Sequence, residues 1–456
     1  MYKKILIASL ALIAGLASCK KDDPTPSPNP PSTLTIDGVA SSLEFYQLDT
    51  AHLSVAGVAK DAAAKAVWVV NGAKAAEGAT FDFTTAHPGK YEVTLTVDGK
   101  SAKHTYTVAP RFSEGAFLLN EGNFGNETGS LTYIHPSKKL VIDQAYYRVN
   151  GTKLGNVCQD LAFGNDQIYI LSQLGPKNGG EGLLTIANSH SLEKVKVYND
   201  EALAQSTPTH IAVLRDHIYI RTERDGILRG SSEGGFTPIT GTKKALKQRM
   251  AQIGERLFAL TKDNKVLMIQ GTQVVRELDL SPAKPSGIAV SHDGKLWVST
   301  TSPNAILKVD PTPDNFVALD THILDKSISA TGPESWQRTT SSAFFAHGDK
   351  LYFTGQSSVI YCHNFATSKT SQVIDVKTID GVGTSANMYY NSLGVDPSTG
   401  ELYYAAFEGY STYNKKNVTM VLKADGTKLL LKEKVNSFPA GFYFIPNAAS
   451  RTGANQ

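Results

Sequence analysis

The sequence predicts an all-β protein in which a small β-sandwich precedes a seven-bladed β-propeller. Three observations predict this class. Apolar strand-like runs separated by polar turns recur along residues 110–448 at intervals of about 40–50 residues, which is typical of propellers. A shorter region of alternating strands, residues 34–109, precedes these repeats. The composition, 41% hydrophobic and 19% charged, is that of a globular protein.

Residues 1–18 are expected to form the signal peptide of a lipoprotein. A basic start is followed by an apolar stretch from Ile5 to Leu16, which is too short for a lasting transmembrane helix. The run Leu16-Ala17-Ser18-Cys19 resembles the lipobox of bacterial lipoproteins, in which the cysteine is diacylated. The alternative is an ordinary signal peptide with a chance cysteine. Lipidation of Cys19 would anchor the mature protein to a membrane without spanning it.

Residues 19–33 are expected to form the lipidated start and a proline-rich linker. Lys20-Lys21-Asp22-Asp23 resembles the signal that sends Bacteroidetes lipoproteins to the outer face of the outer membrane. The alternative is a solvated, charged start to the linker. Proline at the density of residues 24–32 favours polyproline II, a semi-rigid spacer. We therefore expect an outer-membrane protein, anchored by lipid and facing the cell exterior.

Residues 34–109 are expected to form the sandwich. Val67–Val70 is an apolar run, and Asn71-Gly72 after it is a hairpin turn signal. From Tyr91 to Val97, apolar and polar residues alternate strictly, as in a strand with one buried face. This region resembles the PKD/immunoglobulin-like modules of bacterial surface proteins, which implies the role of a spacer.

The propeller prediction rests on six strand–turn–strand pairs, each followed by two further strand-like runs. The pairs are Leu161–Ile170, Ile211–Ile220, Met250–Leu260, Ile288–Val298, Phe344–Phe353 and Leu393–Tyr404. Behind Trp297, for example, the further runs are residues 305–309 and 315–319. Two orphan strands, Phe117–Asn120 and Gly441–Pro446, are expected to pair and complete a seventh blade, which would leave no open edge in the ring. Lys243–Met250 is the best candidate for a helix, and residues 449–456 are expected to be a disordered tail.

Motifs for chemistry are lacking in the sequence. Metal-ligand spacing, a nucleophile elbow and a phosphate-binding loop are all missing, so we expect no enzyme, no cofactor and no metal site. The net charge of +3, from 45 basic and 42 acidic residues, argues against nucleic acid as a partner. Besides the lipobox cysteine there are only Cys158 and Cys362. Free thiols are expected there, although a single disulfide is left open.

The loops at one end of the predicted ring are rich in aromatic, amide and arginine side chains, which is the composition of binding surfaces. We expect ligand-binding residues among Asn123, Phe124, Gln159, Arg221, Arg249, Trp336, Arg338, Tyr389, Tyr390, Tyr410 and Tyr413. Alternatives remain for some of them. Tyr389 and Tyr390 alternate, so one of the two can pack into the core, and Arg221 can simply pair with Glu223.

Two segments carry a resemblance to a known family. Phe117–Gly125, which contains Leu-Asn-Glu-Gly-Asn, and Asn150–Asp160 resemble runs in Bacteroidetes surface lipoproteins with YncE-like propellers, although Asn156 stands where relatives have Asp. BtuG-type members of that group capture cobalamin and pass it to a TonB-dependent transporter. The resemblance therefore implies capture of a nutrient, with a corrinoid favoured. Siderophore or haem capture, a carbohydrate lyase or lactonase, and an adhesion or scaffold protein remain as alternatives.

Overall fold

The computed structural model describes residues 33–39, 44–328, 343–355, 357–387 and 393–446. The chain divides into two compact units, of which one contains residues 51–83 and 91–106 and the other contains residues 44–50, 84–90 and 107 onward. The expected signal peptide, the lipidation site Cys19, residues 20–32 of the linker and the tail lie outside the described residues. Within the described residues, no helix is long and apolar enough to cross a membrane.

The first unit is built on two sheets, in the strand orders β1-β3-β6 and β2-β8-β7-β4-β5. The strands are β1 (Thr35–Asp37), β2 (Phe45–Tyr46), β3 (Thr50–Ala56), β4 (Val67–Val70), β5 (Ala73–Glu77), β6 (Thr80–Thr84), β7 (Gly89–Val97) and β8 (Lys100–Ala109), and one helical turn, α1 (Lys60–Ala63), joins β3 to β4. The Trp68 ring is fully buried, and its Nε1 donates to the carbonyl of Gly78 at 2.9 Å. Strand β7 alternates as predicted, because Val93 and Leu95 are buried while Glu92 is exposed.

Among its described residues, the second unit contains seven four-stranded antiparallel sheets. Six of them follow the chain order: β12 (Cys158–Gly164), β13 (Gln167–Ser172), β14 (Leu184–Asn188) and β15 (Lys194–Tyr198); β16 (Pro208–Leu214), β17 (His217–Thr222), β18 (Gly226–Ser231) and β19 (Gly234–Pro238); β20 (Ala251–Ile253), β21 (Arg256–Leu260), β22 (Lys265–Gln270) and β23 (Gln273–Asp279); β24 (Pro285–Val290), β25 (Leu296–Thr301), β26 (Asn304–Val309) and β27 (Ala318–Ile323); β28 (Phe344–His347), β29 (Lys350–Phe353), β30 (Val359–Asn364) and β31 (Lys369–Asp375); β32 (Leu393–Val395), β33 (Leu402–Phe407), β34 (Asn417–Leu422) and β35 (Lys428–Glu433).

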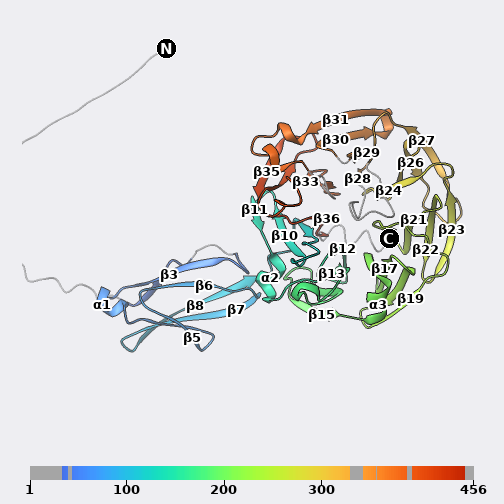
Figure 1. The fold of residues 1–456 in the computed structure, drawn as a ribbon. Helices are drawn as coiled ribbons and strands as arrows, with labels where there is room; N and C mark the ends of the chain where they lie inside the picture. Colours follow the sequence, from blue (N-terminus) through green and yellow to red (C-terminus); the bar gives the residue numbers. More distant parts are fainter. Residues whose placement is uncertain (1–32, 40–43, 329–342, 356, 388–392, 447–456) are drawn as a thin grey trace, which may run out of the picture. The chain divides into compact units, whose positions relative to one another are not determined.

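The seventh sheet joins the two ends of the unit. Its strand order is β11 (Leu140–Ile142), β10 (Ser130–His135), β9 (Ala116–Asn120) and β36 (Pro439–Phe444). Phe442 is the partner of Leu118 in the antiparallel register of β36 and β9. The structure thus contains the pairing that was expected from the two orphan strands. Figure 1 shows the seven sheets arranged in a ring, and four-stranded sheets in a ring fit the β-propeller architecture.

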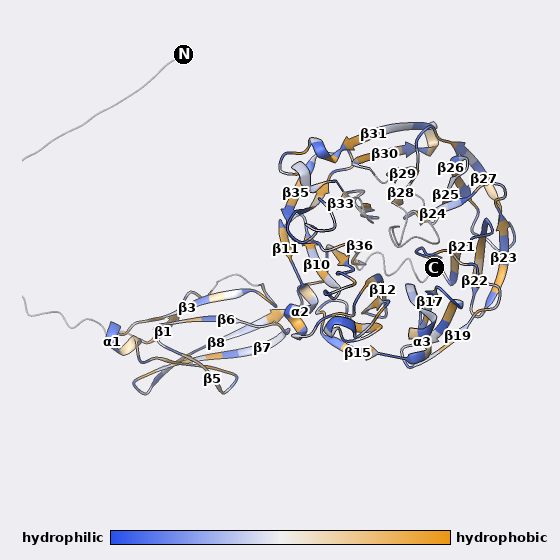
Figure 2. Cartoon of the chain, in the orientation of Figure 1, coloured by the Kyte–Doolittle hydropathy of each residue, from blue (hydrophilic) through white to orange (hydrophobic). Residues whose placement is uncertain are grey.

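Burial decreases from the centre of the ring to its periphery. All seven residues of the inner strand β16 are buried, whereas the outer strand β19 of the same sheet is mostly exposed or half-buried. The middle strands are orange and the outer strands bluer in Figure 2. Neighbouring sheets stack through their apolar faces, as where Leu171 of β13 joins Ile211 of β16 in one core cluster. This packing aligns the first residues of the inner strands around one end of a central channel.

Two expectations on local structure were wrong. Lys243–Met250 forms turns and bends, and the α-helices of this unit are instead α2 (Ala145–Asn150) and α3 (Glu201–Ser206). The outer strand behind Trp297 is β27, Ala318–Ile323, and not residues 315–319. Short 3₁₀ turns occur at Lys177–Gly179, Phe365–Thr367, Val376–Thr378 and Gly383–Ser385. Cys158 and Cys362 are free thiols, so they form no disulfide.

Candidate ligand-binding site in the central channel

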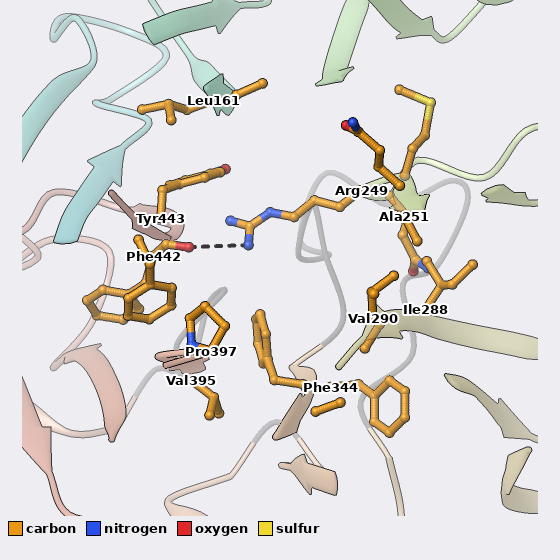
Figure 3. A pocket seen from close by; sticks show the side chains of 18 of the residues that line it. Leu161, Arg249, Ala251, Ile288, Val290, Phe344, Val395, Pro397, Phe442 and Tyr443 are labelled. Carbon is orange, nitrogen blue, oxygen red and sulfur yellow. Dashed lines mark hydrogen bonds between the residues drawn. The ribbon is translucent and has the colours of Figure 1, made fainter. Parts of the chain in front are cut away.

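A cavity of about 390 Å³ lies in the channel, between the inner strands of several sheets. Most of its walls are apolar, and Figure 3 shows these side chains converging on one space. The lining residues include Leu161, Phe163, Ala251, Ile288, Val290, Phe344, Val395, Phe442 and Phe444. Polar groups enter from Gln248, Gln252 and Tyr443, and the cation of Arg249 is present as well. A mostly apolar cavity with a few convergent polar groups is the usual form of a small-molecule site.

Arg249 precedes β20 and extends across the channel toward β36, as Figure 3 shows. Its guanidinium lies over the ring of Tyr443, with the Cζ atom 4.1 Å from the ring centroid. Its Nη1 and Nη2 donate to the carbonyl oxygens of Phe442 and Ala440 at 3.4 and 3.5 Å. These are long hydrogen bonds, since about 2.9 Å is usual for N–H···O.

Gly441 makes this crossing possible. A Cβ atom at this position would lie only 1.7 Å from Nη2 of Arg249 and 2.9 Å from its Cζ. The φ angle of 148° also lies in the region that side chains rarely adopt. The glycine therefore lets the guanidinium lie against the backbone of β36.

Asp160 is the acidic partner in this layer of the channel. Its side chain is 2% exposed, and its two oxygens accept from the Tyr443 hydroxyl at 2.6 Å and from the Ile211 N–H at 2.9 Å. Nε of Arg249 lies 3.4 Å from the nearer oxygen. Burial raises the pKa of the Asp160 carboxyl, while the Arg249 charge acts in the lowering direction. Burial likewise raises the pKa of Tyr443 well above its ordinary value. Asp160, Tyr443 and the partly exposed Arg249 thus join three sheets.

A bulge at the same position in four inner strands determines which of their residues lie level with Asp160. The register of four inner strands shifts at Cys158/Asp160, Pro208/His210, Pro285/Gly287 and Pro439/Gly441. Bulges re-aim the side chain that follows them. Asp160 and His210 therefore occupy the positions that Gly287 and Gly441 hold in the other two sheets. Of the two glycines, Gly441 leaves the space into which Arg249 extends.

The rim at this end of the channel carries a cluster of aromatic rings, which we call the rim cluster: Phe407, Tyr410, Tyr413 and Phe438. Phe438 directly precedes β36 and lies at the centre of the cluster. It stacks on Tyr413 at 4.5 Å and on Tyr410 at 5.8 Å between ring centroids, and it meets Phe407 edge-on at 5.2 Å. Tyr410 remains 45% exposed, so the cluster offers an accessible ring to solvent.

Backbone geometry fixes the central ring. Phe438 has a φ of 53°, which is costly for a residue with a Cβ atom. The strain is held by neighbouring hydrogen bonds, because Glu121 N–H donates to the Phe438 carbonyl at 2.8 Å and Gly122 N–H to the Ser437 carbonyl at 3.2 Å. Burial raises the pKa of both Tyr410 and Tyr413, and nearby acidic groups act in the same direction.

Several predicted site residues lie near this rim. Tyr410 and Tyr413 belong to the rim cluster, and Asn123 and Phe124 lie in the loop that follows β9. The Phe124 ring is 64% exposed, and the ammonium of Lys177 sits 3.5 Å from its centroid. Arg249 lies deeper, in the channel. Trp336, Arg338, Tyr389 and Tyr390 lie outside the described residues.

Three predicted site residues are buried and do not present a surface: Arg221, Gln159 and, within the rim cluster, Tyr413, which is 8% exposed. Arg221 is 2% exposed and is held by the Ala245 carbonyl, the Thr209 hydroxyl and the Glu223 carboxylate, so the pairing alternative describes it better. Gln159 is also 2% exposed, because it sits in the bulge of β12. Sequence reasoning placed Asp160 in a segment at this end of the ring without selecting it as a site residue, and it missed Tyr443. An acidic residue directly before the apolar run of Leu161 was the available signal for the first.

Over the described part of the chain, no group of three or more His, Cys, Asp or Glu residues is placed to hold a metal ion. The described side chains in this region comprise stacked rings at the rim, the cation of Arg249 in the channel and apolar walls below it.

Residues 114–446 match a family model described as a domain of unknown function, DUF5074. The chain belongs to the DUF5074 family. The match spans all seven four-stranded sheets and excludes the first unit. No curated protein sequence matches this DUF5074 chain.

Solved structures are similar to the DUF5074 chain in fold. A quinoprotein alcohol dehydrogenase-like protein from Bacteroides thetaiotaomicron is 15% identical, with a TM-score of 0.57 over 88% of this chain and 96% of that one. A protein from Lactobacillus plantarum is 12% identical, with a TM-score of 0.48 over 73% and 99%. Virginiamycin B lyase from Staphylococcus aureus is 12% identical, with a TM-score of 0.42 over 63% and 90%. At such identities the likeness concerns the fold alone.

Proposed function

We propose that this DUF5074 protein is a lipid-anchored protein of the outer-membrane surface that captures a nutrient, a corrinoid first, and hands it to a TonB-dependent transporter. Its second unit is a seven-bladed propeller that carries the binding face. Its first unit is a PKD/immunoglobulin-like spacer. The lipid anchor rests on the lipobox at Cys19, and the surface location rests on the charged residues that follow it.

The observation that carries the proposal is the rim cluster. Tyr410 and Tyr413 stack on the ring of Phe438, the residue with the strained backbone, with interplanar angles of 27° and 29°. Rings that are fixed before binding lose little conformational freedom when a ligand arrives. The exposed ring at the end of this stack, Tyr410, suits a flat, conjugated ligand, because offset stacking is the preferred contact between π-systems. A corrinoid offers such a macrocycle.

Polar groups beside the rings suit the periphery of the same ligand. The side chain of Asn123 is half-buried next to the rim; its Oδ1 accepts from Gly125 N–H at 2.9 Å, and the side chain also makes a hydrogen bond with Tyr413. Glu127 accepts from the Ser437 hydroxyl at 2.7 Å and is held close to the rings. The amide arms of a corrinoid both donate and accept hydrogen bonds, so this mixed edge complements them.

Isothermal titration calorimetry tests the proposal. The mature chain from residue 20 is titrated with cyanocobalamin, haem and a ferric siderophore, and is incubated with carbohydrate substrates in parallel. We expect cyanocobalamin to bind at micromolar concentration or more tightly. Binding of haem or the siderophore alone would replace the corrinoid by another nutrient. Absence of binding by all three, together with turnover of a carbohydrate, would contradict the proposal and favour the enzyme.

A further inference from the structure

The cavity below the rim cluster has its own chemistry. Its apolar walls come from six sheets, through residues such as Leu161, Ala251, Val290, Phe344, Val395 and Phe442. Among the described residues that line it, Arg249 is the only charged one. A cation at the edge of an apolar space costs solvation free energy unless an anion or hydrogen-bond acceptors replace the lost water.

The available acceptors satisfy the guanidinium poorly. The two carbonyl contacts are 3.4 and 3.5 Å long, and Nε makes no hydrogen bond to the described residues although it lies 3.4 Å from Asp160. The carboxylate of Asp160 is directed elsewhere, because its two oxygens accept from Tyr443 and Ile211 at shorter distances. Arg249 therefore keeps donors that a further acceptor can use.

The size and charge of the site define the ligand. A volume of about 390 Å³ accommodates about a dozen non-hydrogen atoms at about 30 Å³ each. One guanidinium can match one carboxylate in a two-pronged contact. The apolar walls provide no partner for a second charged or strongly polar group.

We propose that the central cavity binds a medium-chain monocarboxylate, with the carboxylate paired to Arg249 and the hydrocarbon body lying against the walls from Leu161, Val290 and Phe344. This site is separate from the rim cluster and does not rest on the capture of a corrinoid. The space left by Gly441 is what allows the cation to reach the carboxylate position.

Calorimetric titrations of the mature chain with octanoate, 1-octanol and octylammonium test the head-group preference. These three ligands share one hydrocarbon body. Octanoate is expected to bind with a dissociation constant of about 0.1 mM, which corresponds to a modest binding free energy per non-hydrogen atom of the ligand. The alcohol and the ammonium are expected to bind at least tenfold more weakly, because only the carboxylate makes a charge-assisted contact. Equal binding of octanoate and 1-octanol would overturn the proposal.

Variants test the position of the site. Arg249→Met should weaken octanoate binding at least tenfold, Arg249→Lys should retain most of it, and Val290→Phe should weaken it by filling the cavity. Arg215→Met is the matched control, because Arg215 is 77% exposed and does not line the cavity. If Arg249→Met fails to fold, the Val290→Phe variant and the wild-type head-group comparison still decide. An unchanged octanoate affinity in the Val290→Phe variant would overturn the proposal. The Tyr410→Ala variant separates the two sites, because it should leave octanoate binding unaltered even if it abolishes corrinoid binding.

Discussion

Substitution of Gly441 by alanine tests how the polar layer of the channel is built. The new Cβ would lie 1.7 Å from Nη2 of Arg249, whereas ordinary contacts begin near 3.4 Å. The guanidinium must therefore move by well over an ångström, away from the carbonyls of β36 and from Asp160. Loss of one partner from a fully buried ion pair typically costs about 3–5 kcal/mol, and the cost is lower here because the Arg249 side chain is 21% exposed. Because Asp160 keeps the Tyr443 hydroxyl and the Ile211 N–H, we expect a loss of about 2–4 kcal/mol.

Urea denaturation followed by tryptophan fluorescence measures this loss. Gly271→Ala is the control, because Gly271 also has a positive φ, 60°, but nothing lies within 4 Å of the point that an added Cβ would occupy. That variant should lose only about 1 kcal/mol, which is the cost of the backbone conformation. Combining Gly441→Ala with Arg249→Met should give much less than the sum of the two effects, because the clash disappears with the guanidinium. Additive effects, or a Gly441→Ala loss equal to that of the control, would refute this reasoning.

Three further predictions concern buried groups. Burial and the nearby His322 lower the pKa of His363 to about 4. Because an unfolded histidine titrates near 6.5, the free energy of unfolding should fall by at most about 3 kcal/mol as pH drops from about 6.5 to 4. His363→Gln should flatten this pH dependence in urea denaturation, and an unaltered pH dependence would assign it to other groups. Burial raises the pKa of both Cys158 and Cys362. The folded chain from residue 20 should therefore react with a thiol reagent at pH 8 far more slowly than the unfolded chain. Rapid reaction of two thiols in the folded chain would contradict the structure. Arg221→Met should lower the free energy of unfolding by about 3 kcal/mol, because it leaves the half-buried Glu223 carboxylate without its closest cation. The control Arg215→Met, at an exposed arginine, should lower it by less than about 0.5 kcal/mol. Equal melting temperatures for the two variants would show that Arg221 is not held as described.

Local patterns were sufficient to predict most of the strands. The pairs around Ile288–Val298 and Leu161–Ile170 are visible because inner and second strands are apolar and their turns contain Gly, Asp or Asn. The pairing of β36 with β9 could be predicted because each orphan lacked a partner nearby in the chain. Outer strands are less predictable: β27 is largely exposed and is not held by a buried face, so its start was misplaced by three residues.

The candidate site could be predicted only in part, because its members come from distant parts of the chain. Tyr410 and Tyr413 were found from composition, but the ring that organises them, Phe438, stands alone before a proline and carries no pattern. The contact of Asp160 with Tyr443 joins residues 283 positions apart, and no periodicity records it. Arg221 looked like a surface cation because nothing local shows that the Ala245 carbonyl and Thr209 enclose it.

The capture of a corrinoid at the rim is tested most directly by comparing two tyrosines in calorimetric titrations with cyanocobalamin. Tyr410 of the rim cluster and Tyr147 of α2 are 45% and 46% exposed, so their substitution removes a similar accessible ring from different places. We expect Tyr410→Ala to weaken binding roughly tenfold, as the loss of one stacked ring typically does, and Tyr147→Ala to leave it within about twofold. Equal affinities for wild type and Tyr410→Ala, or no binding of cyanocobalamin by the wild-type chain, would contradict the proposed function.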